Sequence, residues 1–207
     1  YCRADVSDPD AVAAALARTR AELGPPNGAF HAALVLRDRT VARMGDEDLA
    51  DVLAPKVAGA VAFGEALRAE PLDFLVYFSS AVAFTDAPGQ ANYAAASTFE
   101  DAYAADLRGR CAFPVHVVNW GYWGSVGAVA GGDYAARMAG IGVGSIEPAE
   151  GLAALAAVVR AGVPQALVVK ADRSAMARLG AAVPTEEAED PVTAARASFV
   201  DLERLAA

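Results

Sequence analysis

The sequence has few cysteines, no long apolar run and no cluster of basic residues. Its two cysteines, Cys2 and Cys111, are far apart and lack metal-ligand spacing, which gives no support to a disulfide framework or a zinc site. No apolar stretch reaches roughly 18 residues and no targeting segment is found, so we expect a soluble, cytoplasmic protein. The formal net charge of −9, with no basic run, argues against nucleic-acid and anionic-membrane partners.

Helices and strands are predicted to alternate along most of the 207 residues, a length that suits one globular domain. Ser7 as N-cap, Pro9 in the first turn and Asp10 three residues after the cap predict a helix over about 8–23. Periodic segments predict further helices at about 46–69, 89–108 and 147–161, and apolar runs predict buried strands at 28–36, 74–78, 114–120 and 166–169. This order predicts an α/β fold: a Rossmann-like, doubly wound parallel sheet with helices on both faces.

Two segments depart from the alternating pattern. Residues 121–146 contain eight glycines, too many for a plain helix, which favours a flexible loop or lid. Half of the residues in 184–191 are acidic, which is typical of a linker, and residues 195–207 carry apolar side chains at helical spacing. We therefore divide the chain into a catalytic region, 1–178, and an acidic linker with the start of a following helix or domain, 179–207.

The residues that could carry chemistry gather where the predicted strand 74–78 ends. Ser79 and Ser80 follow that strand directly, Tyr93 opens the next predicted helix, and Lys56 lies in the helix before the strand. Ligands of doubly wound sheets bind beyond the carboxyl ends of the strands. We therefore expect Ser80, Tyr93 and Lys56 to converge on one crevice.

Three runs of the sequence resemble the ketoreductase domains of modular polyketide synthases, which belong to the short-chain dehydrogenase/reductase superfamily. Tyr93 lies 13 residues after Ser80 and 37 after Lys56, the spacing that the family pattern requires of its serine, tyrosine and lysine. The resemblance covers roughly residues 1–175. The runs are Phe78-Ser79-Ser80, Gly89-Gln90-Ala91-Asn92-Tyr93-Ala94-Ala95-Ala96 and Val118-Asn119-Trp120-Gly121-Tyr122-Trp123.

The resemblance implies a catalytic set and a reaction. The reaction is the NADPH-dependent reduction of a carrier-bound β-ketoacyl thioester to a β-hydroxyacyl thioester in polyketide biosynthesis. Tyr93 would protonate the carbonyl oxygen, Ser80 would hydrogen-bond that oxygen, and Lys56 would favour the phenolate and contact the cofactor ribose. The family's asparagine four residues after the tyrosine is Ser97 here, which would hold a relay water less firmly.

The resemblance also implies cofactor contacts, with no metal. Asp5, followed by Val6, matches the aspartate that meets the adenine ring, although capping of the next helix is an equal alternative. His31-Ala32-Ala33 matches a segment beside the cofactor, although a satisfied core histidine is the more common role of such a residue. The remaining expected contacts are Lys56, Tyr93 and Gly121.

The same region departs from the family pattern at several positions. Leu34 replaces a glycine of the family pattern. The family's stereochemical marker is leucine, aspartate, aspartate, and Arg37 replaces its first aspartate. Leu36 and Asp38 are retained, which favours the product configuration associated with the marker. No G-x-G-x-x-G turn occurs. We therefore expect the amino-terminal half of the nucleotide-binding fold to be missing, and NADPH to be the cofactor on the strength of the resemblance alone.

The partners that the resemblance implies are an acyl carrier protein, which presents the substrate on phosphopantetheine, and neighbouring synthase domains. One alternative is a catalytically inactive, structural ketoreductase-like domain, suggested by Ser97 and Leu34. The intact set of Ser80, Tyr93 and Lys56 argues against it. The other alternative is a free-standing short-chain dehydrogenase acting on small alcohols, against which the acidic linker argues.

Overall fold

A computed structural model of the chain describes residues 1–85, 87–129, 132–179 and 199–201. It divides into two compact units, Tyr1–Val117 and Val118–Ala207. The boundary falls inside one strand, β3 (Val115–Trp120). The predicted division at residue 178 therefore lies within the second unit, and the predicted acidic linker, 184–191, lies outside the described residues.

The first unit is built on parallel strands. β1 pairs with β2 in parallel, with Gly28 opposite Phe74 and His31 opposite Tyr77, and the strand order is β1-β2-β3. The carboxyl ends of β1 and β2 therefore lie at the same edge of the sheet. Its elements are α1 (Pro9–Leu23), β1 (Gly28–His31), η1 (Val41–Arg43), α2 (Asp46–Lys56), α3 (Ala58–Leu67), β2 (Phe74–Ser80), η2 (Ala81–Phe84), α4 (Ala91–Arg108) and the first half of β3.

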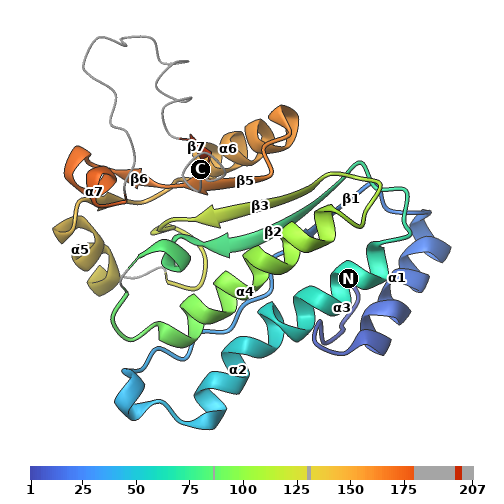
Figure 1. Cartoon of the computed structure of the whole chain (residues 1–207), viewed down its shortest axis with the longest axis horizontal. Coiled ribbons are helices and arrows are strands. Elements are labelled where there is room, and N and C mark those ends of the chain that lie inside the picture. The colour runs from blue at the N-terminus through green and yellow to red at the C-terminus, as the bar shows by residue number, and fades with distance from the viewer. Residues whose placement is uncertain (86, 130–131, 180–198, 202–207) are drawn as a thin grey trace. The chain divides into compact units, whose positions relative to one another are not determined.

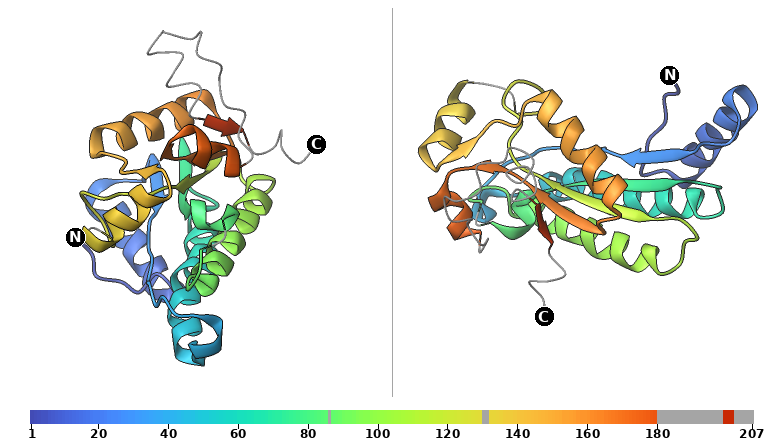
Figure 2. Two further views of the ribbon diagram at one scale, coloured as in Figure 1. Left: turned by 90° about the vertical axis from the view of Figure 1, so that its left-hand side faces the viewer. Right: turned by 90° about the horizontal axis from the view of Figure 1, so that it is seen from above.

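Helices α3 and α4 cover one face of these strands and enclose the main core, and α1 lies beside α3 (Figures 1 and 2). Tyr77 is fully buried there, and its hydroxyl donates to the Ala60 carbonyl at 3.1 Å. Burial raises the pKa of Tyr77 well above its ordinary value. The cluster comprises Ala29, Ala60, Leu67, Leu72, Leu75, Tyr77, Ala104, Leu107, Phe113, Val115 and Val117.

The second unit mixes helices with short strands. β5 pairs with β7 antiparallel, with Leu167 opposite Val200, in the order β3-β5-β7, and β4 pairs with β6 antiparallel. Its elements are the second half of β3, α5 (Gly132–Gly140), β4 (Val143–Gly144), α6 (Pro148–Ala161), β5 (Gln165–Val168), β6 (Lys170–Ala171), α7 (Arg173–Arg178) and β7 (Phe199–Asp201).

The α/β fold with helices flanking a parallel sheet is confirmed, but several predicted bounds are wrong. The helix expected over 46–69 breaks at Val57, where φ is −102° and ψ is −75°. Pro55 lies inside α2 just before this break, and it lacks the N–H that would bond to the carbonyl four residues earlier. Asp8, rather than Ser7, caps α1, because its Oδ1 accepts from the Asp10 N–H at 2.9 Å.

The strand expected over 28–36 ends at His31. The chain then follows a different partner: the Arg39 N–H donates to the Gly89 carbonyl at 2.8 Å, and Gln90 Nε2 donates to Asp38 Oδ2 at 2.9 Å. These bonds hold the chain that follows the apolar run against the loop before α4 instead of along β2.

Residues 121–146 are not a plain loop, because they contain α5 and β4. The glycines at 132 and 140 are the end residues of α5, where they weaken a helix less than in its interior. Residues 199–201 form strand β7 rather than the helical segment expected there, and the other residues of 180–207 lie outside the described part.

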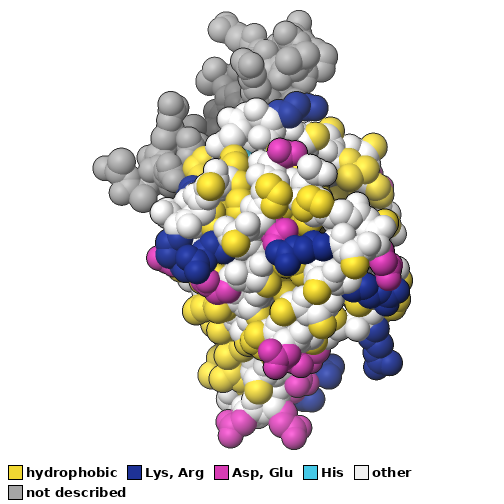
Figure 3. All heavy atoms as spheres, turned by 90° about the vertical axis from the view of Figure 1, so that its right-hand side faces the viewer, with side chains coloured by type: hydrophobic (Ala, Val, Ile, Leu, Met, Phe, Trp, Pro, Cys, Tyr) yellow, Lys and Arg dark blue, Asp and Glu magenta, His cyan; other side chains and the backbone are white. Residues whose placement is uncertain are grey.

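The described surface carries both signs of charge. On the face drawn in Figure 3, Lys and Arg side chains lie interspersed with Asp and Glu side chains, without a continuous basic area. Ion pairs account for part of this pattern, such as Arg110 with Glu65 at 2.7 Å. None of the described helices is long and apolar enough to span a membrane.

Candidate active site

Lys56, the last residue of α2, is buried and held by two partners. Its Nζ donates to Glu100 Oε2 at 2.6 Å and to the Phe78 carbonyl at 2.7 Å. The same nitrogen lies 5.6 Å from the centroid of the Tyr93 ring. The structure therefore brings the predicted lysine and tyrosine together, and it fixes the lysine at the end of β2.

Ser80 and Tyr93 lie on neighbouring elements of the first unit. Ser80 is the last residue of β2, and its Oγ accepts from the Val82 N–H at 3.3 Å at the start of η2. Tyr93 is the third residue of α4, a helix that packs against both β2 and η2. The three predicted catalytic side chains thus come from α2, the end of β2 and the start of α4.

Ser97 lies one turn after Tyr93 on α4 and is fully buried. Its backbone carbonyl accepts from Ser79 Oγ at 3.4 Å, but its own Oγ has no hydrogen-bond partner among the described residues. Buried hydroxyl groups are rarely left without a partner. A water or a ligand group that bonds to the Ser97 hydroxyl would therefore be stabilised. The role of Ser97 in holding a relay water stays a prediction.

His31 is 2% exposed, and its side chain is taken up in the interior of the first unit. Its Nδ1 lies 2.8 Å from Glu100 Oε1, and its ring lies between those of Phe63 and Tyr77, at centroid distances of 5.5 and 5.4 Å. The side chain thus occupies a core position, the alternative left open above. Ala32 and Ala33 follow the carboxyl end of β1 and are exposed and half-buried.

Asp5 and Val6 precede α1, but they do not cap it. Asp5 is exposed, and its Oδ1 accepts from the Ser7 N–H at 2.9 Å and the Ser7 hydroxyl at 2.7 Å. These bonds from Ser7 lower the pKa of Asp5. Val6 packs closely on α3 at Gly59. If Gly59 carried a Cβ, that atom would lie only 2.8 Å from Val6 Cγ1.

Gly121, the remaining predicted cofactor contact, belongs to the second unit. Its N–H donates to the Val168 carbonyl at 2.8 Å, and a Cβ there would lie 3.0 Å from that same carbonyl oxygen. The glycine therefore permits a close approach of two chain segments. Its contact with a cofactor stays a prediction.

Two groups of contacts near the site were not predicted. Asn92 Nδ2 donates to the carbonyls of Arg37 and Asp48, at 3.0 and 3.1 Å, which ties the segment after β1 and helix α2 to the start of α4. Glu100 bridges Lys56 and His31. A sequence signal existed for Glu100, because it follows Tyr93 by seven residues, two helical turns, on the same face of α4.

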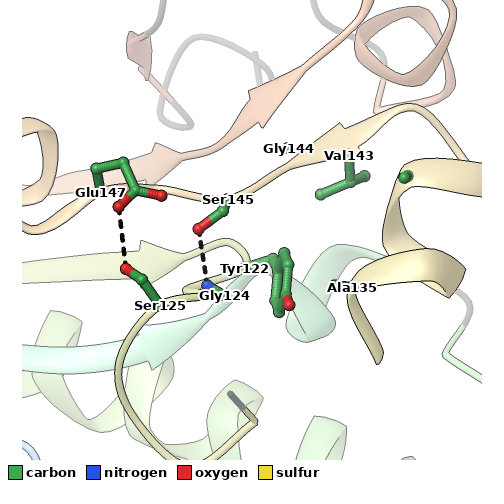
Figure 4. A pocket seen from close by; sticks show the side chains of 9 residues that line it. Tyr122, Gly124, Ser125, Ala135, Val143, Gly144, Ser145 and Glu147 are labelled. Carbon is green, nitrogen blue, oxygen red and sulfur yellow. Dashed lines mark hydrogen bonds between the residues drawn. The ribbon is translucent and has the colours of Figure 1, made fainter. Parts of the chain in front are cut away.

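The second unit contains an open pocket of about 310 Å³ (Figure 4). Ser145 Oγ accepts from the Gly124 N–H at 2.8 Å, and Ser125 Oγ donates to Glu147 Oε2 at 3.0 Å. The Tyr122 hydroxyl is buried without a hydrogen-bond partner among the described residues. The lining residues are Tyr122, Gly124, Ser125, Ala135, Ala139, Val143, Gly144, Ser145 and Glu147, all but the last from the segment predicted to form a lid.

A family comparison decides what kind of domain this is. The model of the KR domain matches residues 1–125, which is more than half of the chain. The chain belongs to the KR domain family. These are the ketoreductase domains of modular polyketide synthases, within the short-chain dehydrogenase/reductase superfamily, as the sequence resemblance predicted.

The related proteins are far longer than this KR domain chain. Polyketide synthase ThaG of Burkholderia thailandensis is 43% identical over 173 residues, which are 84% of the chain and 3% of that synthase. Polyketide synthase PksN of Bacillus subtilis is 39% identical over 170 residues, which are 82% of the chain and 3% of that synthase.

Solved structures agree with the fold. A ketoreductase domain from the bacillaene assembly line superposes with a TM-score of 0.79 at 31% identity, covering 84% of this KR domain chain and 43% of that structure. A-type ketoreductases from a modular polyketide synthase give a TM-score of 0.77 at 30% identity, covering 93% of this chain and 41% of that structure. The chain spans less than half of each of these solved ketoreductases.

Proposed function

We propose that this KR domain takes part in the NADPH-dependent reduction of a β-ketoacyl thioester to a β-hydroxyacyl thioester, with the substrate carried on an acyl carrier protein. Family membership supports ketoreduction in polyketide biosynthesis as the class of reaction. The observation that carries the proposal is the position of the Lys56 ammonium, 5.6 Å from the centroid of the Tyr93 ring. A tyrosine beside a buried cation is suited to proton donation near neutral pH.

Tyr93 acts as the proton donor in this proposal. When bound, NADPH supplies the hydride, and the carbonyl oxygen then needs a proton. A phenol has a pKa near ~10 in water, so its proton is released more readily where the resulting phenolate is stabilised. Lys56 provides that stabilisation because its positive charge is buried and therefore weakly screened.

Ser80 orients the substrate in this proposal. Its hydroxyl stands at the end of β2, where a parallel sheet presents its ligands, and it can donate to the carbonyl oxygen while accepting from the Val82 N–H. A donor that is already fixed in place stabilises the developing negative charge without reorganisation. Ser97 would hold a water near Tyr93 through its unpartnered Oγ.

The residues present fit a nicotinamide cofactor at the strand ends. Ala32 and Ala33 follow the carboxyl end of β1, carry only methyl side chains and are exposed and half-buried, so they allow close approach of a flat ring system. We propose that the backbone of His31, Ala32 and Ala33 lines this position. Lys56 and Tyr93 would hold the ribose, and Asp5 and Val6 would contact the adenine. Gly121 would be the remaining contact with the cofactor.

The carrier-bound form of the substrate is part of the proposal. Because the chain is acidic overall, long-range attraction to an acidic carrier protein is not expected, and tethering within a synthase would supply the effective concentration instead. The pocket beside Tyr122 is proposed to receive part of the acyl chain, since its volume of about 310 Å³ is at the small end of ligand sites.

The test uses the complete ketoreductase, because this chain spans less than half of the solved ketoreductases that it matches. Incubation with a β-ketoacyl-loaded carrier protein and NADPH should yield a product heavier by two hydrogens, detected by mass spectrometry. The same acyl group on a short thiol should react more slowly. A folded enzyme that binds NADPH and leaves both substrates unreduced would favour the structural alternative.

A further inference from the structure

The side chain of Glu100 bridges two buried groups in the interior of the first unit. Its Oε2 accepts from Lys56 Nζ at 2.6 Å, and its Oε1 lies 2.8 Å from His31 Nδ1. The three side chains are 0%, 1% and 1% exposed, for Glu100, Lys56 and His31. Both carboxylate oxygens of Glu100 are therefore engaged, each by a different strand or helix.

Burial determines the charges in this cluster. An ionised side chain removed from water is strongly destabilised unless an opposite charge and hydrogen bonds compensate it. Glu100 provides both for Lys56, so the two form a buried ion pair. A carboxylate can only accept hydrogen bonds, so His31 Nδ1 carries the hydrogen between them, and His31 Nε2, which has no partner among the described residues, holds a lone pair if the ring is neutral.

The cluster determines where the Lys56 ammonium lies. An ammonium has three N–H donors, and Glu100 and the Phe78 carbonyl take two of them. The Tyr93 ring lies near the same nitrogen, with its centroid 5.6 Å from Nζ. Glu100 is held in this position, because His31 bonds to its second oxygen and itself packs against the rings of Phe63 and Tyr77.

We propose that Glu100 is a positioning residue of the ketoreductase: it holds the Lys56 ammonium in its charged form beside Tyr93, and His31 fixes Glu100. This inference rests on the proposed function of Lys56 and Tyr93. Glu100 itself touches neither the substrate nor the cofactor. Tyr93, Ser97 and Glu100 lie on one face of α4, and Glu100 is the member that contacts Lys56.

The ionisable and polar groups around Lys56 come from each element packed on it. Glu100 and Tyr93 belong to α4, the Phe78 carbonyl to β2, and His31 and Tyr77 reach the cluster through Glu100 from β1 and β2. Replacing Glu100 with glutamine keeps the size and the hydrogen-bonding ability of the side chain but removes its charge. The ammonium then remains buried without a counter-charge and should lose its proton at lower pH.

The experiment follows the loss of the proton from Lys56 directly, without relying on turnover. In the complete ketoreductase labelled with 15N-lysine, the Lys56 signal is assigned by its loss in Lys56→Met, and Lys170, which is about half exposed, serves as an internal reference. We expect the Lys56 titration midpoint in Glu100→Gln to lie about one pH unit or more below the native midpoint. Glu65→Gln, which removes a carboxylate from an ion pair at the surface, should leave it unchanged.

Turnover supplies the second readout. We expect kcat of Glu100→Gln to fall about tenfold or more at pH 7 with KM changed much less, and the alkaline fall of kcat to move to lower pH together with the Lys56 midpoint. Glu100→Asp, which keeps the charge, should recover part of the loss. A loss that is equal at every pH, and is not rescued by aspartate, would mean that Glu100 only fills space.

The outcomes separate this inference from the proposed function. An unchanged Lys56 midpoint in folded Glu100→Gln overturns the inference whatever the turnover. A lowered midpoint in an enzyme that reduces no substrate supports the inference and contradicts the proposed function. Should Glu100→Gln fail to fold, the native protein decides: ammonium protons held by Glu100 and Phe78 exchange slowly and are visible by NMR, and their absence overturns the inference.

Discussion

The Lys56 ammonium donates to Glu100 Oε2 at 2.6 Å and lies 5.6 Å from the centroid of the Tyr93 ring. The nitrogen is therefore close both to a counter-charge and to the proposed proton donor. We propose that a lysine in this position contributes both to the stability of the first unit and to the chemistry of the site. The two contributions can be separated by substitution.

Lys56→Met is expected to abolish measurable reduction and to destabilise the complete ketoreductase. It leaves Glu100 buried without a counter-charge, which typically costs about 3–5 kcal/mol. Urea denaturation measures the loss. The double variant Lys56→Met/Glu100→Gln should recover much of the stability but none of the turnover. Equal stability of the single and double variants would show that the ion pair does not contribute in this way.

Gly151→Ala is expected to destabilise the second unit. A methyl group on Gly151 in α6 would overlap the ring of Trp123. Overpacking of this kind costs about 1–3 kcal/mol. Gly140→Ala is the matched control, because a Cβ there meets nothing within 4 Å, and its thermal midpoint should stay close to the native value. Equal midpoints for the two variants would contradict the contact between Gly151 and Trp123.

The ion pair of Glu65 with Arg110 predicts a pH dependence of stability. The hydrogen bond from Arg110, at 2.7 Å, lowers the pKa of Glu65 below its ordinary value of 4.5. Since the pKa is lower in the folded state, the contribution is present above the ordinary pKa and is lost as pH falls through the lowered one.

Glu65→Gln should therefore be less stable than the native protein at pH 7, by about 0.5 kcal/mol for a pair that is more than a third exposed. The difference should vanish below the lowered pKa of Glu65. Denaturation curves at a series of pH values measure it. A difference that persists unchanged into acid would assign the effect to packing rather than to charge.

Sequence reasoning found the strands best where a short apolar run has clear bounds. Phe74–Ser80 and Gln165–Val168 lie within two residues of their predicted positions, because short buried strands are continuous apolar runs. The apolar run after His31 was misread as strand, whereas the chain that follows it bonds to the loop before α4 through the Arg39 N–H. That choice depends on residues some 50 positions away, which periodicity cannot show.

The candidate site could likewise be predicted only in part from the sequence. The spacing of Lys56, Ser80 and Tyr93 identified three side chains that come from adjacent elements, because the resemblance fixed their positions along the chain. Glu100 was not found: its spacing of seven residues from Tyr93 puts it on the same face of α4, but an acidic residue in a helix is normally solvated, so this spacing was not read as a sign of burial. Its partner His31 was considered both for contact with the cofactor and as a core histidine, and its side chain bonds within the core.

The central claim is that this KR domain reduces a carrier-bound β-ketoacyl thioester with Tyr93 as proton donor. Its most direct test is NADPH consumption by the complete ketoreductase, native and Tyr93→Phe, with a β-ketoacyl thioester. Loss of one hydroxyl from a half-buried side chain should leave the fold intact and weaken NADPH binding only modestly, because Lys56 would still contact the ribose, while turnover falls by about 100-fold or more. Turnover in Tyr93→Phe close to the native rate would contradict the assignment of the proton donor, and no turnover in a folded, NADPH-binding native enzyme would contradict the reductase itself.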